Sequence, residues 1–86
     1  MNGGYRVVLQ PRARRDLDRL AKDVLEQLRK AFDELSQNPR GPGTKKLKGI
    51  KGIYRKRSGD FRILYEINDS AHELNVHRVG DRKDVY

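Results

Sequence analysis

The feature that most constrains the fold is a long apolar periodicity near the N-terminus. Between residues 11 and 37, apolar side chains recur every three or four positions, which is the spacing of an amphipathic helix. One unbroken helix over this range would be about 40 Å long, whereas a globular chain of 86 residues has a radius of gyration of only ~12 Å. We therefore predict a helical hairpin broken near Lys22 and Asp23, with Asp23 as N-cap and Glu26 completing a capping box.

Strand-like segments flank this hairpin. Residues 5–10 precede it, and Pro11 suits the first helical turn. Residues 44–51 are predicted to form a basic connector that Leu47 and Ile50 anchor to the core. Three further strands are predicted over residues 53–58, 61–68 and 73–79, joined by turns at 59–60 and 68–70. The expected fold is α+β with the order β-α-α-β-β-β, in which one domain over residues 1–86 packs a helical hairpin on one face of a small, antiparallel-rich sheet.

Register determines which side chains share a face of this sheet. If Gly59 and Asp60 are the two loop residues, Arg57 opposes Arg62 and Arg55 opposes Leu64, and opposed residues point the same way. Three arginines then share the face away from the helices, since Tyr54, Phe61, Ile63, Tyr65 and Ile67 occupy the other face with Lys56 at its margin. Neighbouring guanidinium groups repel one another unless an anion neutralises them, and phosphate suits their planar donors. A slip of one residue would break this grouping.

The positive charge is concentrated in the middle of the chain. The net charge is +8, and residues 40–62 carry nine basic side chains against Asp60 alone, which equals the whole excess. Clustering of one sign is typical of a phosphate-binding surface. The plainer alternative is a face that only keeps the protein soluble.

Composition also excludes several kinds of site. The chain has no cysteine, so disulfides, thiolate zinc sites and cysteine nucleophiles are ruled out. No phosphate-loop motif, dinucleotide-binding motif or metal-spaced histidine cluster is present, and we expect neither cofactor nor metal. No apolar run approaches the ~18 residues of a membrane span, so we expect a cytoplasmic chain without membrane contact. His72 is expected in a solvated turn, whereas His77 could share the arginine face as an acid or base.

Two motifs resemble the RelE/ParE toxin superfamily. They are Y-R-K-R-S-G-D-F-R-I-L-Y-E-I at positions 54–67 and R-V-G-D-R-K-D-V-Y at positions 78–86. The segment K-K-L-K-G at 45–49 and the helical hairpin also match, so the resemblance covers nearly the whole chain. It implies a toxin of a toxin–antitoxin pair. Its partner would be an acidic or amphipathic antitoxin that docks on the sheet or helices, and oligomers are expected only with that antitoxin.

RelE-type members cut messenger RNA in the ribosomal decoding site, where the ribose 2′-hydroxyl attacks the adjacent phosphate without a metal. The resemblance therefore implies a ribosome-dependent mRNA endoribonuclease. By the same resemblance, Arg55 and Arg62 would stabilise the phosphate and its transition state, Arg82 would support or protonate the leaving oxygen, and Arg57 occupies the general-base position. Tyr86 would stack on a base. The side chains expected to contact RNA or the ribosome are Lys45, Lys46, Lys48, Lys51 and Lys56.

Two residues depart from the family pattern. Some RelE-type enzymes have lysine at the general-base position, and Arg57 cannot give up its proton at neutral pH. Asp81 stands where many relatives have histidine or a basic residue. The base could therefore be Asp81 or His77. Two other functions stay open, namely a ParE-like inhibitor of DNA gyrase and a weakly catalytic member that only binds RNA or the ribosome.

Overall fold

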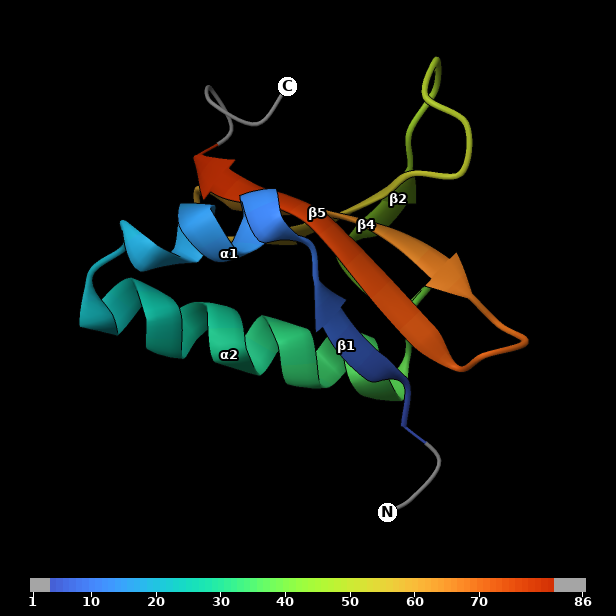
Figure 1. The fold of residues 1–86 in the computed structure, drawn as a ribbon, viewed down its shortest axis with the longest axis horizontal. Coiled ribbons are helices and arrows are strands. Elements are labelled where there is room, and N and C mark those ends of the chain that lie inside the picture. The colour runs from blue at the N-terminus through green and yellow to red at the C-terminus, as the bar shows by residue number, and fades with distance from the viewer. Residues whose placement is uncertain (1–3, 82–86) are drawn as a thin grey trace.

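The computed structural model describes residues 4–81 and shows two helices against a five-stranded mixed sheet (Figure 1). The strand order is β1-β5-β4-β3-β2, with β1 parallel to β5 and the other pairs antiparallel. The expected α+β fold, a helical hairpin packed on an antiparallel-rich sheet, is confirmed. In chain order the elements are β1 (Arg6–Leu9), α1 (Pro11–Asp18), α2 (Lys22–Gln37), β2 (Thr44–Lys46), β3 (Tyr54–Ser58), β4 (Phe61–Asn68) and β5 (Glu73–Asp81).

The break in the hairpin lies where it was predicted, but its cap is different. Helix α1 ends at Asp18 and α2 begins at Lys22, so the N-cap of α2 is Ala21 and the assignment of Asp23 was wrong. Ala21 has extended backbone angles, and its carbonyl oxygen accepts the first helical hydrogen bond from the Leu25 N–H at 3.0 Å. Asp23 instead lies within the first turn, where its negative charge favours the positive end of the helix dipole.

The predicted basic connector contains a short strand. Residues Thr44–Lys46 form β2, which pairs with β3 at the free edge of the sheet. All three residues of β2 are polar, so its sequence has no apolar alternation from which a strand could be predicted. The anchoring role predicted for Ile50 was wrong, because its side chain is 49% exposed, while Leu47 is half-buried.

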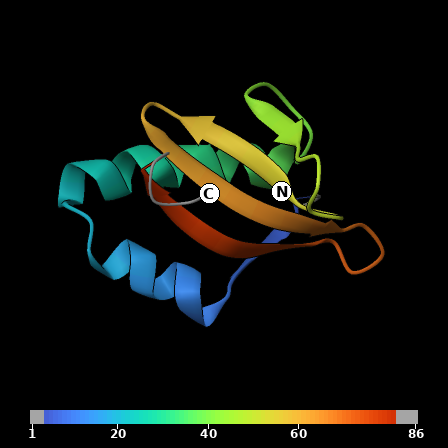
Figure 2. The same ribbon diagram turned by 90° about the horizontal axis from the view of Figure 1, so that it is seen from above.

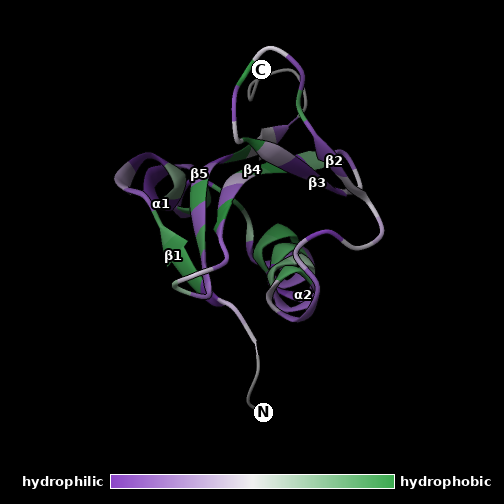
Figure 3. Ribbon diagram, turned by 90° about the vertical axis from the view of Figure 1, so that its right-hand side faces the viewer, coloured by the Kyte–Doolittle hydropathy of each residue, from purple (hydrophilic) through white to green (hydrophobic). Residues whose placement is uncertain are grey.

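Both helices pack on the same face of the sheet. Figures 2 and 3 show α2 beneath the curved middle of the sheet and α1 beside β5. Ala13 of α1 and Leu28 and Leu35 of α2 are fully buried against Ile63, Tyr65, Leu74 and Val76 of β4 and β5. The expected helix-facing set of β3 and β4 is confirmed, since its members Tyr54, Phe61, Ile63, Tyr65 and Ile67 all belong to this core or pack on it. Within residues 4–81, neither helix is long and apolar enough to cross a membrane.

Helix α1 covers the part of β5 that β1 does not reach. The pairing of β1 with β5 ends at Val76, and beyond it the Asp16 carboxylate accepts hydrogen bonds from the Val79 N–H and from Arg78 Nε, both at 2.9 Å. Burial alone would raise the pKa of Asp16, but these hydrogen bonds outweigh it and hold the pKa below its usual value. The carboxylate therefore completes the hydrogen bonding of the β5 edge.

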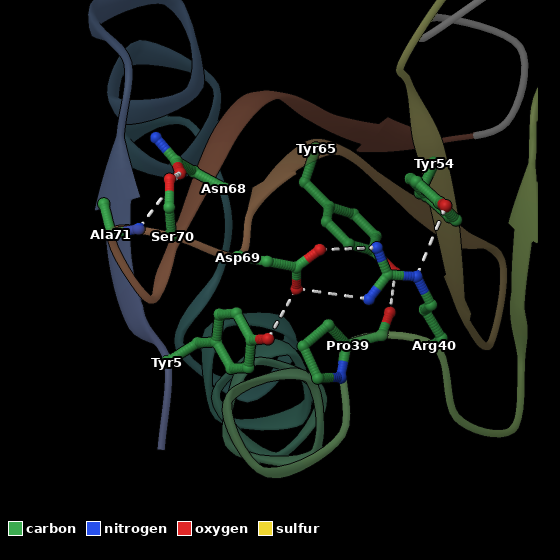
Figure 4. A network of polar contacts seen from close by, with 9 residues as sticks. All are labelled: Tyr5, Pro39, Arg40, Tyr54, Tyr65, Asn68, Asp69, Ser70 and Ala71. Carbon is green, nitrogen blue, oxygen red and sulfur yellow. Dashed lines mark hydrogen bonds and ion pairs between the residues drawn. The ribbon is translucent and has the colours of Figure 1, made fainter. Parts of the chain in front are cut away.

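A second polar network joins the loops at the other end of the molecule (Figure 4). Asp69, in the β4–β5 turn, accepts hydrogen bonds from the Tyr5 hydroxyl at 2.6 Å and from Arg40 at 3.0 Å. The Tyr65 hydroxyl donates to the Pro39 carbonyl oxygen at 2.5 Å, and burial raises the pKa of Tyr65 to about 12. Both links hold the loop after α2 against the sheet.

Candidate nucleic-acid interface

The register of the β3–β4 hairpin is the predicted one. Arg57 opposes Arg62 and Arg55 opposes Leu64, with Gly59 and Asp60 in the loop. Gly59 has φ +59°, which the first loop residue of a type II′ hairpin requires and glycine adopts without strain. Opposed residues share a face, so the three arginines lie together on the side of the sheet away from the helices. We call this surface the arginine face; it comprises Lys45, Arg55, Arg57 and Arg62.

The basic residues of this face form two rows that run across the strands. One row passes from Lys45 on β2 to Arg55 on β3 and Leu64 on β4; Arg78 follows on β5, but its guanidinium is paired with Asp16 of α1. The next row passes from Arg57 to Arg62 and ends at Gly80. Neighbouring strands lie about 4.8 Å apart, so these cationic side chains are within reach of one oligonucleotide backbone.

Arg55, Arg57 and Arg62 have no carboxylate partner within residues 4–81. Arg62 is only 6% exposed, and its guanidinium donates to the backbone carbonyls of Gly59 and Phe61 at 3.3 and 3.2 Å. Arg57 is exposed, and the buried Nε of Arg55 has no hydrogen-bond partner among the described residues. These hydrogen bonds orient Arg62 without neutralising it. The face therefore keeps its positive charge for an external anion.

Two other cations of the basic segment are neutralised inside the molecule. Arg40 forms an ion pair with Asp69. The buried Lys56 Nζ contacts Glu34 Oε1 of α2 and donates to the Pro42 carbonyl, both at 2.8 Å. The prediction placed Lys56 among the residues that contact RNA, but the structure turns it to the helix side of the sheet. We therefore leave it out of the candidate interface.

The remaining lysines named in the sequence analysis are exposed. Lys45 shares the arginine face through its pairing with Arg55, whereas Lys46 opposes Tyr54 and so lies in a row that faces the helices. Lys48 and Lys51 belong to the loop between β2 and β3, which projects from the sheet (Figure 1). Of these lysines, Lys45 thus lies in the arginine rows, whereas Lys48 and Lys51 lie in the adjoining loop.

A carboxylate–histidine pair also lies on this side of the sheet. The ladder between β4 and β5 shifts at Leu64 and Tyr65, so that His77 is an extra, unpaired residue of β5, a β-bulge. His77 Nε2 lies 2.5 Å from Glu66 Oε1, and both side chains are about half exposed. The sequence analysis placed His77 here but missed Glu66. The available signal was a change of spacing, because the buried positions Val76 and Val79 are three apart where a regular strand requires two.

Three predicted site residues remain, at the C-terminal end of β5 and beyond it. Asp81 pairs with Phe61, whose side chain packs on the core, so register assigns Asp81 to the helix side. Arg82 and Tyr86 lie outside the described residues. Within residues 4–81, no group of three or more acidic or histidine side chains is arranged to hold a metal ion.

Comparison with known proteins gives consistent matches over most of the chain. A family model described as "ParE toxin of type II toxin-antitoxin system, parDE" matches residues 7–86. Toxin RelG of Mycobacterium tuberculosis is 34% identical over 83 residues, which cover 95% of each chain. The mRNA interferase toxin RelE of Escherichia coli K12 is 31% identical over 95% of this chain and 90% of its own.

Solved structures match in the same way. The RelBE2 toxin–antitoxin complex of M. tuberculosis contains a chain with a TM-score of 0.83 and 34% identity, covering 94% of both chains. The isolated E. coli RelE toxin has a TM-score of 0.77 and 29% identity, over 90% of this chain and 83% of that one.

Proposed function

Because the chain belongs to the RelE/ParE superfamily of type II toxin–antitoxin toxins, we propose that it is an endoribonuclease that cuts messenger RNA on the ribosome. The observation that carries this proposal is the pairing of Arg57 with Arg62 beside Arg55, on a face where no described carboxylate neutralises them. A protein that only binds another protein has no need for such an assembled phosphate site. The name of the E. coli relative, mRNA interferase toxin, supports the same reading.

The proposed chemistry is an intramolecular transesterification of the RNA. The ribose 2′-oxygen attacks the adjacent phosphorus, negative charge builds up on the non-bridging oxygens, and the 5′-oxygen leaves. Arg55 and Arg62 would stabilise that charge, together with Arg57 opposite Arg62, since fixed cations at a partly desolvated site act without reorganising during the reaction. Arg82 would assist the leaving oxygen, and Tyr86 would stack on a neighbouring base. Lys45, Lys48 and Lys51 would bind the flanking phosphates.

We also propose a cognate antitoxin as the partner of this toxin and the cytoplasm as its location. Related toxins from M. tuberculosis and E. coli were crystallised as toxin–antitoxin complexes. An acidic or amphipathic antitoxin segment would complement the net charge of +8 and keep RNA from the arginine face.

The test is cleavage of a message on programmed ribosomes by the purified full chain. We expect Arg57→Gln and Arg62→Gln to reduce the single-turnover rate by about 10²–10³-fold, the loss typical of removing one preorganised charge donor. Arg57 is exposed, so its replacement leaves the fold intact even if the buried Arg62 has a structural part. Arg14→Gln, on the exposed side of α1, removes the same unit of charge and should leave the rate unchanged.

A gyrase supercoiling assay on the same preparations separates the alternatives. Inhibition of supercoiling with intact message would replace this proposal with a ParE-like activity. Binding to ribosomes without any cut would identify a module that binds RNA but does not cleave it.

A further inference from the structure

The proposed cleavage needs a base for the 2′-hydroxyl proton, and the residue at the expected position cannot supply it. Arg57 keeps its proton at any physiological pH. Asp81 is assigned by register to the helix side of the sheet, away from the arginine rows. The group sought must therefore be a proton acceptor on the arginine side, close to the row that contains Arg55.

The Glu66–His77 pair meets these conditions. His77 is the bulge residue directly before Arg78. Arg78 itself pairs with Leu64 on β4, which in turn pairs with Arg55 on β3. His77 Nε2 is 2.5 Å from Glu66 Oε1. A carboxylate only accepts hydrogen bonds, so in the neutral pair the imidazole proton lies on Nε2 and the lone pair on Nδ1. The side chain of His77 is 39% exposed, which gives a ligand access to it.

The surroundings of the pair suit an RNA backbone. The loop between β2 and β3 passes next to Glu66 at Gly52, where a Cβ atom would stand 3.9 Å from Glu66 Oε2. That loop carries Lys48 and Lys51. A phosphate held by Arg55 on β3 would thus have cations on two sides, with the imidazole two strands away on β5, across β4.

We propose that His77 is the general base of the reaction and that Glu66 is the residue that positions it. This inference rests on the proposed function. His77 Nδ1 takes the 2′-hydroxyl proton as the 2′-oxygen bonds to phosphorus, and the phosphorus–O5′ bond breaks. The 5′-oxygen takes up a proton, and His77 returns its own to solvent. The products are a 2′,3′-cyclic phosphate and a 5′-hydroxyl, and no water, metal or other reactant is consumed. Glu66 holds the productive tautomer and stabilises the imidazolium as it forms.

Several charged groups from the neighbouring elements surround His77. The charged groups around His77 are Glu66 on β4, Arg55 on β3, Arg78 on its own strand and its partner Asp16 on α1, with Lys51 in the adjacent loop. The other histidine, His72, lies in the β4–β5 turn and stacks on Tyr5.

The experiment measures single-turnover cleavage of ribosome-bound message against pH for four full-length proteins. These are the wild type, His77→Asn, Glu66→Gln and the matched control His72→Asn, which keeps a residue that tolerates the positive φ of that turn. We expect the rates of the wild type and of His72→Asn to fall along an acid limb of the pH profile, because a protonated imidazole cannot accept the 2′-hydroxyl proton. His77→Asn should be slower by about 10²–10⁴-fold with that acid limb absent, and Glu66→Gln slower by about 10–100-fold with the limb retained. Ribosome affinity should stay within twofold in all four.

The outcomes distinguish this inference from the proposed function. If the wild type cuts and His77→Asn cuts equally fast with the same acid limb, the inference is overturned and the function stands. If His77→Asn loses affinity in proportion to rate, His77 binds RNA and is not the base. If the wild type makes no cuts, the proposed function itself has failed. Far-UV circular dichroism of each variant shows whether the fold has been kept.

Discussion

Replacing Asp16 by alanine should lower the free energy of unfolding by about 2–4 kcal/mol. The Asp16 side chain is 15% exposed and that of its partner Arg78 is 23% exposed, so the pair is largely shielded from water. The substitution leaves the Val79 N–H without its acceptor, which costs about 1–3 kcal/mol. It also leaves the largely buried Arg78 without a counter-ion, which adds roughly 1 kcal/mol once its remaining exposure is taken into account.

Urea unfolding followed by far-UV circular dichroism at pH 7 measures this loss. The midpoint should fall while the m-value stays constant, and the melting temperature should fall by about 10–30 °C. Asp16→Asn retains an oxygen for Val79 and should lose only about half as much. Glu26→Ala is the control, since Glu26 and Arg29 form a pair that is more than 60% exposed and should contribute under about 0.5 kcal/mol. An Asp16→Ala protein as stable as this control would refute the idea that α1 is anchored to β5 through Asp16.

The same pair predicts a pH dependence with a definite sign. The folded pKa of Asp16 lies below its usual value, so its contribution to stability is complete above about pH 4, the ordinary carboxyl pKa. That contribution is lost as the pH falls through the lower, folded value. The stability difference between wild type and Asp16→Ala should therefore shrink below pH 4. A stability difference that stays constant down to pH 2 would contradict this role of the Asp16 carboxylate. The other carboxylates do not affect the comparison, because both proteins contain them.

Two further substitutions test the parts of the structure that support the arginine face. Tyr65→Phe removes the buried hydrogen bond to the Pro39 carbonyl and should cost about 1–2 kcal/mol in urea unfolding; an unchanged midpoint would show that water replaces the hydroxyl. Lys56→Met keeps the buried stem and removes the charge that pairs with Glu34, so cleavage and RNA affinity should change by less than about twofold and stability by under about 1.5 kcal/mol. A loss of RNA affinity in this variant would show that Lys56 does contribute to RNA binding.

The register of the arginine face could be predicted from sequence because two independent signals agree. Apolar residues alternate on β4, and Gly59-Asp60 is a turn that permits a two-residue loop. Together they determine which residue opposes which, and the opposition of Arg57 to Arg62 follows. Strand β2 lacked any such signal, since its three residues are all polar and show no apolar alternation. The bulge at His77 had a signal in the spacing of Val76 and Val79, but a single change of spacing does not say which side chain it exposes.

The neutralised cations could not be identified from charge counts. Arg40 and Lys56 both belong to the basic segment, yet their partners Asp69 and Glu34 come from other elements, 29 and 22 positions away in the sequence. Such pairs depend on how the loop after α2 folds back on the sheet, and no local pattern encodes that path. The overall charge of the segment therefore does not say which of its cations stay unpaired, and that selection needed the structure.

The alternation of one hairpin explains how a small domain tolerates a concentrated positive charge. Odd and even positions of a strand face opposite sides, so residues 54–67 supply both the helix-facing core and the arginine rows. On the core side, the single cation Lys56 is buried and must be paired, and it is, with Glu34. On the other side, Arg55 and Arg57 can remain without an internal carboxylate among the described residues, since water screens their repulsion. Under the proposed function, a bound phosphate would relieve that repulsion, and the core-facing half of the hairpin would hold the arginines in place for it.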